Sequence, residues 1–274
     1  TYELHDVYRA LSVLASEMDF IQSEVYKNSF FLGNRNDRIL YYDCTNFYFE
    51  SEQPDEDVVD EVTGEIIKGM RQYGLSKEHR PNPIVEMGLF MDSRGIPITM
   101  CLHPGNTSEQ LTAIPLEKEV LKMLPNARFI YCADVGLGSY NIRKFNSMGG
   151  RAFIVTQSIK KMSNTLKEAV FNDYDYKLLS DHTSVSISKM KNFDRFDLKN
   201  RDLYNDTAYK VIEADQLLDV GIYEDVTLKN GRTVQRKAKG ILKQRIIITF
   251  SRKIMEYQRA VRKQLQDLYL HHSH

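Results

Sequence analysis

Apolar side chains recur every three or four residues at the start of the chain. Within residues 4–26, Leu11, Leu14 and Met18 follow this spacing, which is the period of a helix with one buried face. We therefore predict a helical lead-in over residues 1–36, ahead of the first strand.

Runs of apolar residues without helical spacing follow, and each predicts a mostly buried strand. The expected strands are residues 38–49, 84–91, 96–102, 128–133 and 151–156. Residues 108–124 and 139–148 predict helices between the last three strands. Three strands in a meander, then helix, strand, helix and strand, predict a mixed sheet flanked by helices. This is the layout of an RNase H-like fold in the α/β class.

The pattern loosens after Lys160 into short alternating stretches. These are residues 183–188, 208–212 and 221–228, with an Asn-Gly turn at residues 229–232 and a strand at residues 245–250. They predict a β-rich insertion region towards the C-terminus, followed by a helix over residues 252–269. The predicted segments are a helical lead-in (1–36), an RNase H-like core (37–172), a β-rich region (173–250) and a basic C-terminal helix (251–274).

The charged residues are unevenly distributed along the chain, although the formal net charge is zero. Residues 50–65 hold eight acidic side chains and no basic one, whereas residues 232–263 hold eleven Lys or Arg and a single acidic residue. The basic segment is either a solvated face or a surface that contacts phosphates. In the second interpretation Arg236, Lys237 and Lys239 are candidate DNA contacts.

The chain has no run near the roughly 18 apolar residues of a membrane span, and its N-terminus lacks a signal-peptide pattern. We therefore expect a soluble cytoplasmic protein, associated with the nucleoid of a bacterial or archaeal cell, with no membrane partner. The chain begins at Thr1 and ends directly after the basic segment, so we expect a fragment. The three cysteines lack metal-ligand spacing and are expected to be small buried hydrophobes.

Two aspartates interrupt or end apolar strands, where a carboxylate is costly to desolvate. Asp43 lies in the first predicted strand and Asp134 directly follows the fourth. Either one alone is explained as a strand-end cap for the following loop. Together, on adjacent strands of one sheet, they form a candidate site for a hard divalent cation.

The sequence around these aspartates resembles a known enzyme family. Residues 42–50 (Tyr-Asp-Cys-Thr-Asn-Phe-Tyr-Phe-Glu) are similar to the first-aspartate strand of DDE transposases of the IS4 superfamily, most closely the IS1634-like branch. Four further blocks resemble that family in the same order. They are residues 74–80 (Gly-Leu-Ser-Lys-Glu-His-Arg), 88–97 (Gly-Leu-Phe-Met-Asp-Ser-Arg-Gly-Ile-Pro), 104–109 (Pro-Gly-Asn-Thr-Ser-Glu) and 132–137 (Cys-Ala-Asp-Val-Gly-Leu).

The resemblance implies a DNA-cutting and DNA-joining enzyme that acts on transposon ends and target DNA, as a possible homodimer. In such enzymes three carboxylates hold Mg²⁺ or Mn²⁺ for phosphodiester cleavage and strand transfer. Asp43 matches the first carboxylate and Asp134 the second. The third, a glutamate in a Tyr/Arg/Glu/Lys pattern, has no match here, and Glu256 is assigned a surface role. We expect the fragment to be inactive and its parent protein to be the enzyme.

Two loops in the matched blocks carry further candidates. Lys77 and Arg80 are placed to contact DNA phosphates, although a solvated polar loop explains them equally well. Asn106 and Thr107 are explained structurally, by an unusual backbone angle and a helix cap. Two rival functions stay open: a non-catalytic nucleic-acid-binding or assembly module derived from a transposase, and a different RNase H-like nuclease.

Overall fold

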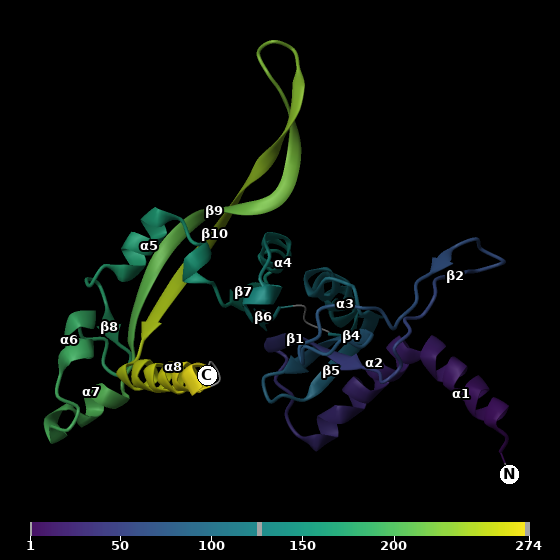
Figure 1. Cartoon of the computed structure of the whole chain (residues 1–274), viewed down its shortest axis with the longest axis horizontal. Coiled ribbons are helices and arrows are strands. Elements are labelled where there is room, and N and C mark those ends of the chain that lie inside the picture. Colours follow the sequence, from purple (N-terminus) through teal and green to yellow (C-terminus); the bar gives the residue numbers. More distant parts are fainter. Residues whose placement is uncertain (1, 125–127, 272–274) are drawn as a thin grey trace. The chain divides into compact units, whose positions relative to one another are not determined.

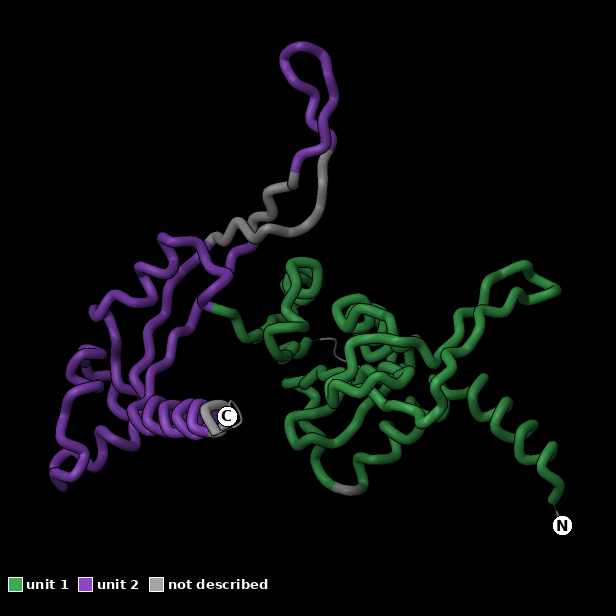
Figure 2. Tube along the Cα trace, viewed as in Figure 1, with its two compact units in different colours: residues 1–158 green, residues 159–274 purple. Residues whose placement is uncertain are grey.

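A computed structural model describes residues 2–124 and 128–271, apart from the side chains of residues 32, 215–224, 237–241 and 268–271. The chain divides into two units, Thr1–Ser158 (unit 1) and Ile159–His274 (unit 2) (Figure 2). None of the described helices is long and apolar enough to cross a membrane.

Five strands form the central sheet of unit 1 (Figure 1). They are β1 (Ile39–Tyr48), β4 (Ile84–Asp92), β5 (Pro97–Pro104), β6 (Ile130–Ala133) and β7 (Ala152–Val155). Their order is β5-β4-β1-β6-β7. Strand β4 is antiparallel to β1 and β5, whereas β1, β6 and β7 run parallel. In chain order this sheet reads 3-2-1-4-5 with only the second strand reversed, so the predicted RNase H-like fold is confirmed.

One face of this sheet is covered by the helices α3 (Glu109–Met123) and α4 (Tyr140–Asn146). Alternation along β1 turns Leu40, Tyr42 and Cys44 towards this covered face, and all three are buried. The rings of Tyr42 and Phe90 pack with centroids 4.7 Å apart. The core of unit 1 therefore lies between the sheet and α3.

The opposite face of the sheet, called here the open face, carries the odd-numbered residues of β1. Tyr41 is 44% exposed and Phe47 is 50% exposed. The strand register adds further exposed apolar residues to this face. They are Met100, Leu102 and Ile154.

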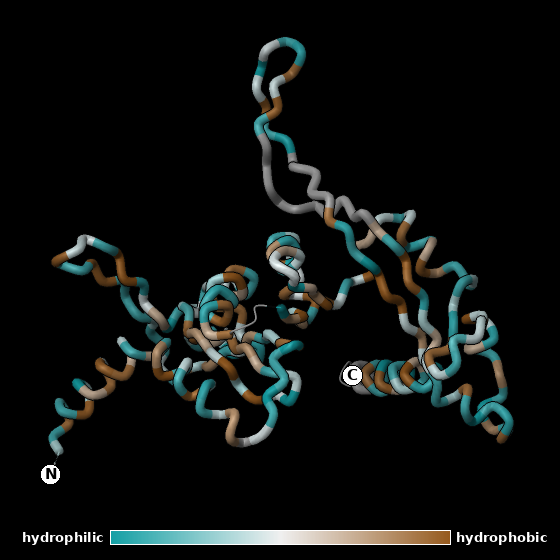
Figure 3. The backbone as a smooth tube through the Cα atoms, turned by 180° about the vertical axis from the view of Figure 1, so that it is seen from behind, coloured by the Kyte–Doolittle hydropathy of each residue, from teal (hydrophilic) through white to brown (hydrophobic). Residues whose placement is uncertain are grey.

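The N-terminal helices are α1 (Leu4–Ser16) and α2 (Met18–Asn28), followed by the 3₁₀ helix η1 (Ser29–Leu32). In α2, the Gln22 side chain accepts a hydrogen bond of 2.5 Å from the Met100 amide of β5. No residue of α1 is buried, so the predicted buried face is wrong for that helix. Its apolar and polar residues do alternate as expected (Figure 3), because periodicity specifies a face and not a packing partner.

The acidic segment between β1 and β4 is not entirely a loop. It contains a short hairpin of β2 (Val58–Val59) and β3 (Ile66–Ile67). Asp60 accepts hydrogen bonds from the amides of Val62 and Thr63 at its turn. These local bonds allow a very polar sequence to form two short strands.

Unit 2 is built on a three-stranded sheet of order β10-β9-β8. Its elements are η3 (Ile159–Lys161), α5 (Asn164–Phe171), β8 (Lys177–Leu178), α6 (Ile187–Asn192), η4 (Leu198–Asn200), α7 (Arg201–Asn205), β9 (Ala208–Thr227), β10 (Thr233–Phe250) and α8 (Arg252–His271). The predicted Asn-Gly turn is confirmed, since the Leu228 amide donates to the Arg232 carbonyl and Gly231 has a φ of 77°.

Two of the predicted alternating stretches merge into the single strand β9. The third, at residues 183–188, is wrong as a strand: it makes one isolated bridge and then enters α6. The physical reason is Ser186, whose hydroxyl accepts a hydrogen bond of 3.1 Å from the Lys189 amide and so caps that helix. A small core of Tyr176, Val185, Met190 and Ala208 holds this part of unit 2 together.

Candidate metal and nucleic-acid site

The strand register brings Asp43 and Asp134 together. In the parallel pair of β1 and β6, Leu40 lies opposite Tyr131 and Tyr41 opposite Cys132. Continuing this register by two residues places Asp43 opposite Asp134, just past the end of β6. Neighbouring strands lie roughly 4.8 Å apart, so the two carboxylates form a candidate site at the open face.

Local hydrogen bonds orient one oxygen of each carboxylate. Asp43 Oδ1 accepts from the Cys44 amide at 2.9 Å. Asp134 Oδ1 accepts from the Val135 amide and from the Thr156 hydroxyl, both at 2.6 Å. The Thr156 bond, with help from the Val135 amide, holds the pKa of Asp134 below its ordinary range. Asp134 is therefore ionised at neutral pH.

The donor set suits one hard cation. Both aspartates are exposed, and within the described residues the Oδ2 atom of each has no hydrogen-bond partner. Mg²⁺ commonly binds one or two carboxylates and completes its octahedron with water. Across residues 2–124 and 128–271, however, no group of three His, Cys, Asp or Glu side chains forms a metal cluster. A complete three-carboxylate site is thus not present in the described part of the chain.

Glu256, the only acidic residue of the basic segment, is held by its own unit. It forms ion pairs with Arg252 at 2.6 Å and with Arg195, and accepts from the Tyr204 hydroxyl at 3.2 Å. The Arg252 hydrogen bond is the main reason that the pKa of Glu256 lies below its ordinary value. These contacts tie α8 to the segment around α7, which is a structural role.

The candidate DNA contacts in the loop before β4 differ in their surroundings. Lys77 donates to the Cys44 carbonyl and pairs with Glu109 at 3.3 Å. Arg80 lies over the Tyr48 ring, 4.5 Å from its centroid, and is exposed. In this loop, His79 adopts a left-handed backbone conformation, with a φ of 55°. Asn106 is not among the positive-φ residues of the described chain, so the unusual angle expected there is wrong.

The basic candidates of the second region lie on β10. Arg236 is exposed and pairs in register with Glu224 of β9. The side chains of Lys237 and Lys239 lie outside the described residues; their backbones flank a register shift in the strand. DNA contact by these three residues stays a prediction.

A pocket of about 650 Å³ lies at one end of the central sheet. It is lined mainly by residues of two blocks singled out in the sequence, 74–80 and 104–109, and also by Gln110, Gly136 and Glu86. Sequence reasoning missed Glu86. The same signal that identified Asp43, an acidic residue inside an apolar strand, is present at residues 84–91 and would have found it.

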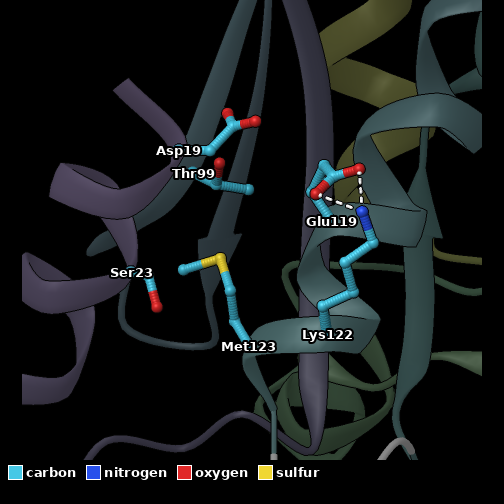
Figure 4. Close-up of a pocket in the computed structure, with 6 residues that line it drawn as sticks. All are labelled: Asp19, Ser23, Thr99, Glu119, Lys122 and Met123. Atoms are coloured by element: carbon cyan, nitrogen blue, oxygen red, sulfur yellow. Dashed lines mark hydrogen bonds and ion pairs between the residues drawn. The ribbon is translucent and has the colours of Figure 1, made fainter. Parts of the chain in front are cut away.

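A second pocket, of about 160 Å³, lies between α2, β5 and α3 (Figure 4). Glu119 and Lys122 face each other there with N–O distances of 2.8 and 2.9 Å. Because these two charged groups pair with each other, neither is left to bind a charged ligand in this small pocket.

No protein-family model matches the chain, and neither does any curated protein. Among solved structures, the piggyBac transposase synaptic complex with hairpin DNA superposes with a TM-score of 0.32 and 15% identity, over 50% of this chain and 26% of that chain. The Mos1 transposase paired-end complex with the left transposon end gives a TM-score of 0.28 and 18% identity, over 51% and 40%. The chain spans less than half of either transposase. Since these scores are low, the fold assignment rests on strand order.

Proposed function

We propose that this chain is the metal-binding part of a DDE-type transposase catalytic domain, in which Asp43 and Asp134 supply the first two carboxylates. The parent protein would cleave DNA at transposon ends and join it to target DNA. The observation that carries the proposal is the register of β1 and β6, which aligns the two aspartates in a sheet of RNase H-like order. The sequence resemblance described above supports the same assignment.

The role of each residue follows from its surroundings. Asp43 and Asp134 would hold a Mg²⁺ or Mn²⁺ ion through their Oδ2 atoms, and this ion would supply Lewis-acid stabilisation of charge on a phosphodiester. The Thr156 hydroxyl donates to the other oxygen of Asp134 and so helps to fix the orientation of that carboxylate. With two of three carboxylates, the chain alone is expected to bind metal weakly and to show no strand transfer.

Metal binding is the direct test. Titration of the chain with Mn²⁺, followed by electron paramagnetic resonance, is expected to detect a site that Asp43→Asn and Asp134→Asn each weaken at least about tenfold, because each removes a charged ligand. Asp175→Asn is the matched control: Asp175 is exposed in unit 2 at a φ of 68°, which Asn also tolerates. Equal Mn²⁺ affinity in all four proteins would rule out the site.

The alternative function is a non-catalytic nucleic-acid-binding or assembly module. One observation favours it, namely that no third carboxylate joins Asp43 and Asp134 among the described residues. Labelled transposon-end DNA should be incubated with metal and with this chain or a version of it extended by about one domain's length, roughly 150 residues. Cleavage by the extended protein alone, lost on Asp43→Ala, supports the enzyme, whereas inactivity of both supports the module.

A further inference from the structure

The pocket of about 650 Å³ described above holds a buried acceptor without a donor. Glu86 of β4 is only 4% exposed, and its Oε2 atom has no hydrogen-bond partner among the described residues. Its other oxygen receives one long bond of 3.5 Å from Asn46 Nδ2. A buried carboxylate oxygen without a donor is costly, so this atom is suited to a ligand that donates.

The pocket is rigidly framed. Asn46 Oδ1 accepts a hydrogen bond of 3.4 Å from the Lys77 amide, and Asn46 Nδ2 donates one of 3.3 Å to the Leu75 carbonyl. These two bonds fix the loop that contains Leu75 and Lys77 over β1. The backbones at Gly74 and Gly105 approach each other so closely that a Cβ atom at Gly74 would lie 1.8 Å from the Gly105 carbonyl oxygen. Only glycine permits that approach. Blocks distant in sequence therefore meet in one preformed cavity.

The size and charge of the pocket indicate an organic ligand rather than an ion. Pockets of roughly 300–1,000 Å³ accommodate small organic groups. One cation, Lys77, is already engaged by Glu109, so the pocket offers little net charge to a phosphate. The exposed Leu75 contributes apolar surface to its lining. An organic group that carries a hydrogen-bond donor suits such a site.

The pocket also adjoins the proposed metal site. Gly136 lines the pocket, and it follows Asp134 by two residues, so at most about 7 Å separates the two Cα atoms. Glu86 is on the covered face and the aspartates are on the open face, so a DNA strand with one phosphate at the aspartates would reach the pocket by passing over Gly136. This step rests on the proposed function.

We propose that the pocket receives an unpaired base of the bound DNA strand, whose exocyclic amino group donates to Glu86 Oε2. Cytosine, adenine and guanine carry such a group, whereas thymine lacks it and can donate only through its ring N3–H. Enzymes that act on DNA commonly read an extruded base through its edge within a fitted pocket. Glu86 is then a specificity-determining residue for the strand end.

The test uses the full chain and short single-stranded DNA, with EDTA present so that metal binding plays no part. Probes are fluorescent pentathymidine and versions of it with a central dC, dA, dG or abasic site, titrated by anisotropy. The wild type is expected to bind the best amino-bearing centre about tenfold more tightly than dT, in line with a hydrogen bond to a charged group. Glu86→Gln is expected to reduce that preference to less than about threefold, because the charge is lost.

Two further variants complete the design. Gly136→Leu fills the pocket mouth, since a Cβ atom there meets only Glu109 Oε2 at 3.8 Å, and should lower the affinity of every probe to that of the abasic one. Glu168→Gln changes an exposed glutamate of α5 in unit 2 and should leave the preference unchanged. Melting temperatures check folding, and Gly136→Leu decides the question if Glu86→Gln unfolds.

Equal affinity for all centres in the wild type, absence of binding, or a preference retained in Glu86→Gln overturns the inference. These results are distinguishable from failure of the proposed function. Loss of Mn²⁺ binding in Asp43→Asn with no base preference in EDTA rejects the pocket alone. A Glu86-dependent preference without any Mn²⁺ site rejects the metal-binding function instead.

Discussion

Two glutamates on the covered side of the central sheet and two aspartates on its open face differ in exposure. On the covered face, Glu86 and Glu117 are 4% and 0% exposed, and burial raises the pKa of both. On the open face, Asp43 and Asp134 are exposed, and the pKa of Asp134 is lowered by the Thr156 hydroxyl. The two glutamates on the covered side are thus shielded from water, whereas the two aspartates on the open face are exposed to it.

This difference separates two kinds of function. A metal site needs carboxylates that are ionised at neutral pH, and the open face provides them with little desolvation. A hydrogen-bonding pocket needs an acceptor shielded from water, and the covered face provides that in Glu86. Three predictions test the comparison, beginning with the largest effect.

Phenylalanines on the two faces should respond very differently to truncation. Phe90 is 0% exposed on the covered face, whereas Phe47 is 50% exposed on the open face. We expect Phe90→Ala to lower the free energy of unfolding by about 3–5 kcal/mol, because it creates a cavity. Phe47→Ala should cost about 1 kcal/mol or less. Urea denaturation measures both, and similar losses would show that the open face is buried in solution.

Glu117 should make stability depend on pH. It accepts from Asn146 at 2.9 Å, and desolvation is the main cause that raises its pKa from 4.5 to about 7. The folded protein then binds more protons than the unfolded chain between pH 4.5 and 7, so this group lowers stability as pH rises through that window. The effect should reach the order of 3 kcal/mol above pH 7.

Glu117→Gln should remove this component. Denaturation of the wild type and the variant across pH 4 to 8 isolates it, because other titrating groups are common to both proteins. Glu168→Gln, an exposed substitution, should leave the pH profile unchanged. If the difference in stability between wild type and Glu117→Gln stays constant over the whole range, Glu117 does not titrate as described.

The smallest effect is expected at Asp134. Thr156→Val removes the hydroxyl that donates to Oδ1, so the pKa of Asp134 should rise towards its ordinary value. The lowered pKa stabilises the fold above the unfolded value near 3.8 and the contribution is lost as pH falls. Since Asp134 is exposed, the change in stability should be below about 0.5 kcal/mol. Carboxyl chemical shifts in an NMR titration measure the pKa directly, and an unchanged value would contradict the assignment.

Much of unit 1 was predictable because its signals are local. Apolar runs located β1, β4, β5, β6 and β7, and the order of strands and helices indicated the fold. The candidate site was also visible, since Asp43 interrupts an apolar strand. Glu86 gave the same signal, but its significance depends on a missing donor and on loops that meet around it. Neither can be read from its neighbours in sequence.

Unit 2 and the N-terminal helix were less predictable, for a related reason. Short alternating stretches identified β structure but did not show that residues 208–227 form one strand. Ser186 ended the expected strand at residues 183–188 by capping a helix. For α1, the helical period was right, while the burial of its apolar face depended on a partner that the period does not specify.

The sequence by itself determined the elements of unit 1, the strand positions of Asp43 and Asp134 and the distribution of charge, because these follow from side-chain period and type. The tertiary structure alone decided the register that, when continued, places Asp43 opposite Asp134. It also decided that Thr156 donates to the second aspartate and that Glu86 Oε2 is buried without a donor among the described residues. Each of these depends on contacts between residues distant in the chain. Such contacts set register, burial and pKa, and they are fixed only when the sheet is assembled.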